Sequence, residues 1–205
     1  MKKFILAIMA MVLTAPAFAQ MSSGGFALSN STVYYGVRIG ASFSTLDVNL
    51  LEVTPDLGTK AGMTLAGVIG LRVSESVPVF LESGLYYNGR GAKNDEYKVN
   101  LNYLEIPILI KYGVNIKDQI TVLPFVGPYF GYAIGGKAFL PGHDGSPFFK
   151  EGGIKHGDMG FKFGAGVEYN MLYLEAGYQA GVANIGKKPN ETHTGSFFMN
   201  FGINF

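Results

Sequence analysis

The 205-residue sequence contains no cysteine and no tryptophan, and only 15% of its residues are charged. Without cysteine, the chain has neither a disulfide framework nor an attachment point for a lipoprotein anchor. The formal net charge is +1 and no polybasic segment is present, which argues against nucleic acid as a partner. Long hydrophobic runs are also missing, because no apolar run beyond the first 19 residues approaches the roughly 20 residues of a membrane-spanning helix.

Glycine and aromatic residues are abundant instead. The 29 glycines suit a tightly curved sheet, and the 12 tyrosines and 16 phenylalanines suit rings placed at a membrane–water interface. The length is that of one domain. This composition favours a curved β-sheet protein in contact with a membrane over a helical membrane protein.

Residues 1–19 have the pattern of a secretory signal peptide. Two lysines precede an apolar run at 4–13, and the Ala-Phe-Ala sequence at 17–19 matches a small-x-small cleavage site. Loss of the two lysines changes the formal charge of the mature chain from +1 to −1. Residues 20–31 are rich in serine and glycine and are predicted to form a flexible lead-in, which leaves 32–205 as the folded domain.

The chain ends in FFMNFGINF, which alternates between two kinds of residue. Every odd-numbered position from Phe197 to Phe205 is apolar, and in a strand these side chains share one face. The opposite face carries Phe198, Asn200, Gly202 and Asn204. The last strand of an outer-membrane barrel has this pattern, because lipid contacts one face and the final aromatic lies at the interface. Such a terminal phenylalanine also resembles the signal read by the barrel-assembly machinery.

Seven further stretches alternate with period two, so we predict an all-β fold: an eight-stranded antiparallel up-and-down transmembrane β-barrel. The predicted strands are 32–44, 62–73, 79–90, 101–112, 121–135, 158–169, 172–182 and 197–205. The links between them alternate between long and short, as periplasmic turns and outer loops do. The long links are 46–61, 91–100, 136–157 and 183–194. An even number of strands places both termini in the periplasm, so we expect a bacterial outer-membrane protein in contact with outer-membrane lipid.

Aromatic residues on the apolar face are predicted to form two interfacial girdles. If the first strand runs outward, four of them lie near the periplasmic rim: Tyr35, Tyr112, Tyr169 and Phe205. Two others, Tyr87 and Tyr132, lie near the outer rim.

The second face of each strand is dominated by glycine, serine and alanine, with few charges, which suits a narrow lumen better than a water-exposed surface. We predict a lumen cluster at mid-height: Arg38, Glu82, Glu105, Lys162 and Glu175. An unpaired charge in a narrow lumen is costly, and the mixed signs allow pairing. This predicts a structural plug rather than an open channel. Two alternatives are a narrow pore for small solutes and a soluble, lipocalin-like barrel whose apolar face lines a cavity for a lipid-like ligand.

Three prolines fall within the predicted fourth and fifth strands, at Pro107, Pro124 and Pro128. Proline removes a donor from the hydrogen-bond ladder, and a closed barrel has no edge strand to accommodate it. We therefore expect a bulge or a gap in the pairing between these two strands.

The segment YLEIPILIKY at 103–112 resembles the PorT-like outer-membrane β-barrel family. Three other segments are similar to that family's strands: GVRIGASF at 36–43, GPYFGY at 127–132 and GVANI at 181–185. The resemblance covers nearly all of the mature chain and implies an eight-stranded outer-membrane barrel. Its namesake is linked to protein export across the outer membrane, so the resemblance also suggests a component of an envelope or secretion assembly. The shared motifs are structural and imply no activity.

Candidate chemistry is sparse. The three histidines, His143, His156 and His193, fall in the predicted long links and match no metal-ligand spacing. His193, Ser196 and Asp158 supply the residue types of a lipid-acting enzyme, but no motif connects them. We therefore expect no enzyme, no catalytic or metal residues and no cofactor.

The link at 136–157 is apolar for an exposed loop, because it contains Phe139, Leu140, Phe148 and Phe149. These residues either present a surface to an envelope protein or fold over the barrel mouth. We therefore predict a structural or interaction protein with extended outer loops.

Overall fold

The computed structural model describes residues 31–49, 58–93, 98–117, 120–140, 143–147, 155–186 and 191–205. The predicted signal peptide and almost all of the lead-in lie outside these residues. Ten strands are present: β1 (Val33–Asn49), β2 (Gly58–Arg72), β3 (Val79–Lys93), β4 (Lys98–Tyr112), β5 (Val114–Lys117), β6 (Ile120–Leu140), β7 (His143–Pro147), β8 (Gly157–Tyr169), β9 (Leu172–Gly181) and β10 (Glu191–Asn204). The described residues include no helix that is long and apolar enough to cross a membrane.

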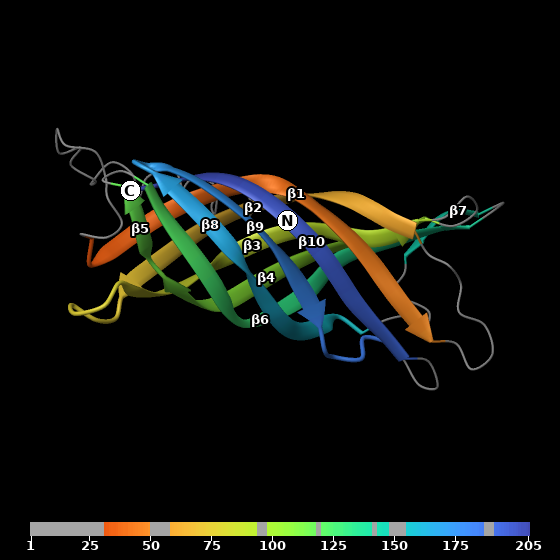
Figure 1. Ribbon diagram of the computed structural model, residues 1–205. Helices are drawn as coiled ribbons and strands as arrows, with labels where there is room; N and C mark the ends of the chain where they lie inside the picture. The colour runs from red at the N-terminus through yellow and green to blue at the C-terminus, as the bar shows by residue number, and fades with distance from the viewer. Residues whose placement is uncertain are drawn as a thin grey trace.

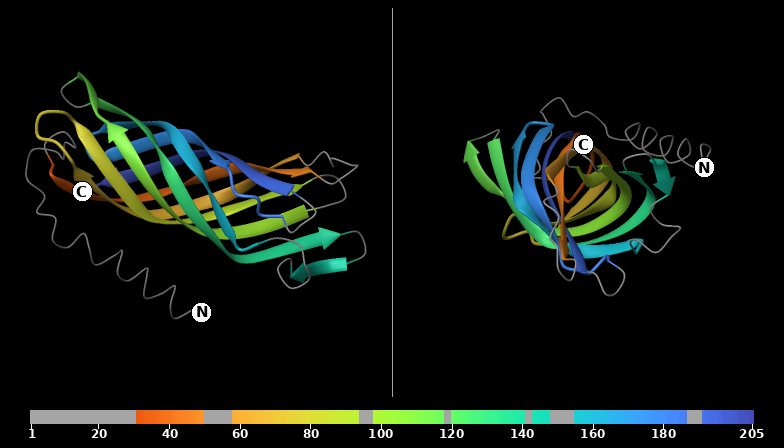
Figure 2. Two further views of the ribbon diagram at one scale, coloured as in Figure 1. Left: turned by 90° about the horizontal axis from the view of Figure 1, so that it is seen from below. Right: turned by 90° about the vertical axis from the view of Figure 1, so that its right-hand side faces the viewer.

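Eight long strands close into an antiparallel barrel (Figures 1 and 2). Each pairs with its neighbour in the chain, β1 pairs with β10, and β4 pairs with β6. Since every long strand has a partner on both sides, the sheet has no open edge around its circumference. The predicted eight-stranded up-and-down barrel is confirmed.

Two short strands extend the barrel beyond the predicted elements. Beyond Gly113, β5 continues the line of β4 and pairs with the start of β6, where a turn was predicted. At the opposite end, β6 runs on to Leu140 and pairs with β7, inside the predicted long link. The sequence of β7, HDGSP, has no apolar alternation, so period-two analysis could not detect it.

The two ends of the barrel differ. We call the end that holds Val33, Phe205 and β5 the terminal end, and the end that holds β7 the loop end; they lie at opposite sides of Figure 1. Backbone hydrogen bonds join Phe205 and Tyr35 in both directions, at 2.8 and 3.1 Å. The C-terminus is therefore part of the wall of the barrel.

One row of directly paired residues can be followed around the whole barrel. In order it contains Val33, Leu71, Leu81, Ile110, Val126, Phe163, Tyr178, Phe197 and Phe43. The row starts at Val33 on β1 and returns to the same strand ten residues later, at Phe43. A closed barrel with this stagger has strands tilted by roughly 40° from its axis. The row consists of apolar residues and climbs from the terminal end toward the loop end.

The apolar residues face outward and the polar residues face the lumen. Ile110 and Tyr132 on the outside are 57% and 58% exposed, whereas Arg38 and Glu82 on the inside are 1% exposed. This arrangement is the reverse of a soluble barrel and suits a wall surrounded by lipid. The alternative of a soluble barrel with an apolar cavity is therefore wrong.

The prolines are accommodated with little disturbance of the register. Pairing of β4 with β6 runs to Pro107 opposite Tyr129 and resumes in the same phase at Ile110 opposite Val126. The register shift lies further toward the loop end, between Asn102 and Tyr103. The pairing is therefore interrupted near Pro107, while the bulge lies away from the prolines.

Two inward glycines make room for tyrosine rings in the lumen. A Cβ atom on Gly70 would overlap the ring of Tyr34, and one on Gly166 would overlap the ring of Tyr173. Both rings lie fully inside the barrel at the terminal end. Glycine on the inner face therefore determines where large side chains can fill the narrow lumen.

Candidate functional site

The terminal half of the lumen is organised around one carboxylate. We call this set the Glu82 cluster: Tyr34, Arg38, Glu82, Lys111 and Tyr173. Glu82 accepts a hydrogen bond of 2.7 Å from the Tyr34 hydroxyl and lies 2.8 Å from the Lys111 ammonium and 3.5 Å from the Arg38 guanidinium. Lys111 also donates to the Tyr173 hydroxyl at 2.9 Å, and the Arg38 guanidinium stacks over the Tyr173 ring. Two cations therefore share one buried anion.

The loop half of the lumen has the opposite arrangement. We call this set the Arg90 cluster: Arg90, Tyr103, Glu105, Tyr129 and Asp158. Arg90 forms ion pairs with Glu105 and, at 3.0 Å, with Asp158, and its guanidinium lies 5.2 Å from the ring centres of Tyr103 and Tyr129. Asp158 also accepts a hydrogen bond of 3.1 Å from the Tyr129 hydroxyl. Two anions therefore share one buried cation.

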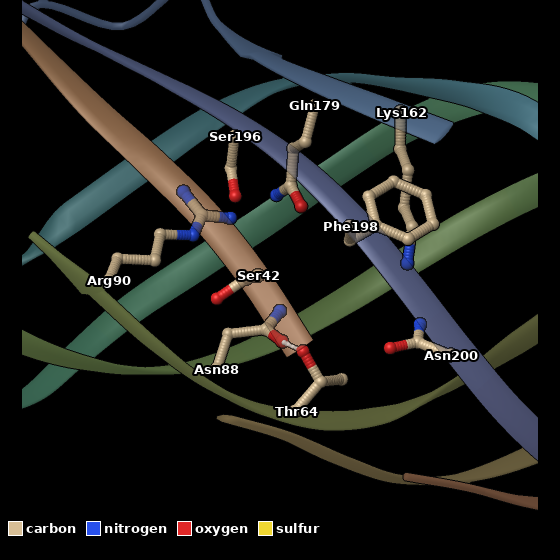
Figure 3. Close-up of a pocket in the computed structure, with 9 residues that line it drawn as sticks. All are labelled: Ser42, Thr64, Asn88, Arg90, Lys162, Gln179, Ser196, Phe198 and Asn200. Atoms are coloured by element: carbon tan, nitrogen blue, oxygen red, sulfur yellow. Dashed lines mark hydrogen bonds between the residues drawn. The ribbon is translucent and has the colours of Figure 1, made fainter. Parts of the chain in front are cut away.

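Between the two clusters lies a small polar chamber (Figure 3). It is lined by Ser42, Thr64, Asn88, Arg90, Lys162, Gln179, Ser196, Phe198 and Asn200. The side chains leave no room between them for a sphere the size of a water molecule. Within the described part of the chain, this pocket therefore offers no continuous aqueous path.

Lys162 is the unusual residue of this chamber. Its side chain is 3% exposed, and its ammonium lies 4.2 Å from the ring centres of both Tyr86 and Phe198. None of the described residues forms a hydrogen bond or an ion pair with it, so cation–π contacts provide its close stabilisation. Lys162 therefore remains a buried cation without a contacting anion.

Apolar clusters close both ends of the lumen. At the terminal end the cluster consists of Tyr34, Phe80, Leu123 and Tyr173. At the loop end it consists of Ala92, Leu101, Tyr103, Ala133 and Ile185. Ile185 belongs to the segment that follows β9, and its backbone bonds to Thr192 and Lys155 hold it fully buried over the mouth. We call these two sets the terminal cap and the loop cap.

The structure places all five residues of the predicted lumen cluster inside the barrel, but in different groups. Arg38 contacts Glu82 in one half, and Glu105 pairs with Arg90 in the other. Glu175 lies 4.0 Å from Lys111 and accepts a hydrogen bond of 2.8 Å from Asn200, which also lines the chamber of Lys162.

The sequence pattern does not predict the central roles of Arg90, Asp158, Lys111 and Ile185. The first three fall on the second, polar face of the predicted strands 79–90, 158–169 and 101–112, which predicts an inward direction but no partner. Ile185 ends the GVANI segment at 181–185, but that motif does not predict that the residue covers the mouth of the barrel.

The predicted girdle residues lie on the outer surface of the barrel. Tyr35, Tyr112 and Tyr169 are about half exposed near the terminal end, and Phe205 is partly exposed beside them. Tyr132 is exposed and Tyr87 partly exposed toward the loop end. On β1, Tyr35 and the outward Phe43 are eight residues apart, which corresponds to about 20 Å along the barrel axis at this tilt. This separation approaches the height of about 25 Å expected for the apolar band of such barrels.

The three histidines belong to separate segments of the chain. His143 belongs to β7 and His193 to β10, so their prediction as loop residues is wrong; both strands extend further than the alternation indicated. His156 contacts the Ala133 carbonyl at 2.8 Å and stacks on the Tyr132 ring. Among the described residues there is no group of three or more potential metal ligands.

The residues considered for a lipid-acting enzyme are also separated. Ser196 and Asp158 are buried in the lumen, whereas His193 occupies an outward-facing position of β10. Strand residues that are an odd number of positions apart point to opposite faces of the sheet. His193 and Ser196 are such a pair on β10, so their side chains point to opposite faces of the barrel wall. The side chains of Phe139, Leu140, Phe148 and Phe149 lie outside the described residues.

Solved structures similar to this chain come from several bacteria. The attachment invasion locus protein Ail of Yersinia pestis is 13% identical, with 85% of this chain and 100% of that chain covered and a TM-score of 0.46. Neisserial surface protein A is 17% identical, with 85% and 98% covered and a TM-score of 0.48. A major outer membrane protein of Thermus thermophilus is 12% identical, with 85% and 100% covered and a TM-score of 0.48.

No curated protein sequence is significantly similar to this chain. The match to a protein family is extensive, however: residues 18–186 match the family described as outer membrane protein beta-barrel domain. The match covers most of the barrel wall, and the barrel carries its apolar residues outside. The chain therefore belongs to the outer membrane protein beta-barrel domain family of bacterial outer-membrane proteins.

Proposed function

We propose that the protein is a non-enzymatic anchor in the outer membrane that presents its loop end to another envelope protein. The observation that carries this proposal is the filled lumen: two ion-paired clusters and two apolar caps occupy it from end to end. A blocked lumen leaves the exposed ends of the barrel as the surfaces available for function. Among the residues that the structure describes, the β6–β7 hairpin continues past the barrel wall at the loop end (Figure 2).

The loop end faces the outside of the cell in this proposal, and both termini face the periplasm. An even number of wall strands and the tight turn at 170–171 support this orientation. Membership of the PorT-like branch, with a place in a secretion or envelope assembly, is a finer part of the same proposal and rests on the motif at 103–112. The terminal strand β10 and the Phe205 that follows it would be read by the barrel-assembly machinery during insertion.

Cysteine labelling tests the orientation cleanly, because the natural chain contains no cysteine. Gly157→Cys places a thiol in open space at the loop end, and Ser76→Cys places one in the exposed turn at the terminal end. A membrane-impermeant maleimide should label intact cells that carry Gly157→Cys and label Ser76→Cys only after the cells are lysed. The reverse pattern would contradict the orientation.

The partner is tested by photo-crosslinking in whole cells. A photoreactive residue at Ser146, in the β6–β7 hairpin, should give one defined crosslinked envelope protein, and the same residue at Ser76 should not. Replacing residues 138–149 by a short glycine–serine turn should remove the partner from co-purified barrels while leaving the heat-dependent shift in gel mobility. A folded barrel that crosslinks to no protein from the hairpin would contradict the anchor function.

A narrow pore for small solutes is the second candidate. The chamber beside Lys162 favours it, because polar side chains and an ammonium without a contacting anion meet there. Movement of the clusters on either side would be needed to connect this chamber to both ends. Ion conduction across a bilayer separates the two candidates.

A further inference from the structure

Three lysines gather on the outer surface of the barrel at the loop end. Lys93 on β3 and Lys98 on β4 are directly paired across the two strands. Lys137 on β6 is paired with Asn100, two residues from Lys98, so Lys98 and Lys137 are diagonal neighbours. All three side chains are exposed. We call this set the lysine patch.

This arrangement is unfavourable for the isolated barrel. Like charges that face each other directly across a sheet destabilise the pairing. A fourth lysine, Lys60 on β2, adds to the positive potential, because Lys98 lies close enough for the two charges to repel. Lys60 itself is paired with the buried Ser44, at an inward-facing position of β2, and donates to the Arg90 carbonyl at 3.3 Å, so it is not part of the patch. No described residue forms an ion pair with Lys93, Lys98 or Lys137.

The depth of the patch identifies the kind of anion that would neutralise it. Lys93 follows Tyr87, a residue of the upper girdle, by six positions on the outward face of β3. Six residues at this strand tilt span about 15 Å along the axis. Lysine side chains can extend several ångströms back toward the membrane, so their ammonium groups reach the headgroup layer above the aromatic rings.

We propose that Lys93, Lys98 and Lys137 form a binding site for the phosphate groups of a saccharolipid headgroup in the outer leaflet. The patch lies on the wall of the barrel, beside the lipid, so a membrane lipid is its natural ligand rather than a soluble anion. The leaflet assignment rests on the orientation under "Proposed function", but binding of the headgroup itself does not. The cysteine labelling described above and the binding experiment below can therefore fail independently.

The binding experiment uses the purified full-length mature chain in zwitterionic detergent micelles, titrated with fluorescent diphosphorylated lipid A. Each lysine near an anionic headgroup should contribute roughly a fivefold change in affinity, so the triple variant K93Q/K98Q/K137Q should bind about a hundredfold more weakly. Dephosphorylated lipid A should bind wild type and variant equally. Lys155→Gln is the matched control, because Lys155 is exposed at the same end but lies outside the patch, and it should retain wild-type affinity.

Two further experiments test which anion the lysine patch binds. Excess inorganic phosphate should not displace the lipid; complete displacement would identify a free anion and overturn the proposal. The variant D95N/E96Q removes the two acids of the segment that joins β3 and β4 and should bind lipid A at least as tightly as wild type. Wild-type affinity in the triple variant, or lipid binding that appears only in D95N/E96Q, would also overturn the proposal. The heat-dependent gel shift confirms that each variant is folded.

Discussion

Both halves of the lumen compensate buried charges by ion pairing, but the shared central charge is negative in one half and positive in the other. In the Glu82 cluster one carboxylate is shared by two cations, and in the Arg90 cluster one guanidinium is shared by two carboxylates. Both groups are almost fully buried, where an unpaired charge is costly. The excess cation of the Glu82 cluster is offset by Glu175, which lies 4.0 Å from Lys111. The Arg90 cluster keeps one excess carboxylate beside the chamber that also holds the Lys162 ammonium.

The clusters also differ in whether an ion pair would remain if the central residue were lost. Without Glu82, Lys111 keeps Glu175 at 4.0 Å and the Tyr173 hydroxyl at 2.9 Å, and Arg38 keeps its contact with the Tyr173 ring. Without Arg90, Glu105 keeps hydrogen bonds from Asn88 and Gln179, and Asp158 keeps hydrogen bonds from Thr194 and Tyr129. The described residues offer these two carboxylates no other ion pair, however. The loop half therefore depends more strongly on one side chain than the terminal half does.

The largest effect is expected from Arg90→Leu. This change leaves two buried carboxylates without their shared cation, and we expect it to lower the free energy of unfolding by about 3–5 kcal/mol. Urea titration of the barrel in lipid vesicles measures this change. Lys93→Met is the matched control, because it removes a cation from the exposed face of the same strand and should shift the free energy by less than about 1 kcal/mol. Equal losses in both variants would contradict the role assigned to Arg90.

A smaller effect is expected from Glu82→Leu. The two cations lose their shared anion but retain other partners, so we expect a loss of about 2–3 kcal/mol in the same titration. Tyr34→Phe removes only the hydroxyl that donates to Glu82 and should cost about 1–2 kcal/mol. If Glu82→Leu were more damaging than Arg90→Leu, the asymmetry between the two halves would be wrong.

The smallest effect is expected from Lys162→Met. Its ammonium has no contacting anion among the described residues, and methionine preserves an unbranched side chain between the rings of Tyr86 and Phe198. We expect a change of less than about 1 kcal/mol in either direction, since replacing a poorly compensated buried charge is often neutral or stabilising. A loss comparable to that of Arg90→Leu would show that Lys162 belongs to an ion-paired cluster.

The sequence predicts the wall of this barrel well and the contacts in its lumen poorly. Period-two alternation identifies which side chains face lipid, because a strand fixes that choice locally. It does not identify their partners: Arg90 and Asp158 are 68 residues apart and meet only because barrel closure and the ten-residue stagger bring β3 and β8 to the same height. Ile185 escaped prediction for a related reason, since a segment without alternation carries it over the mouth.

The most direct test of the filled lumen is single-channel recording of the purified protein in a planar lipid bilayer. The ion-paired clusters and the two caps predict insertion without discrete current steps. Correct insertion would be verified by protease resistance of the barrel in the same lipid. Reproducible steps from the folded wild-type protein, reduced in size by substitution of Lys162, would contradict the filled lumen and favour the narrow pore.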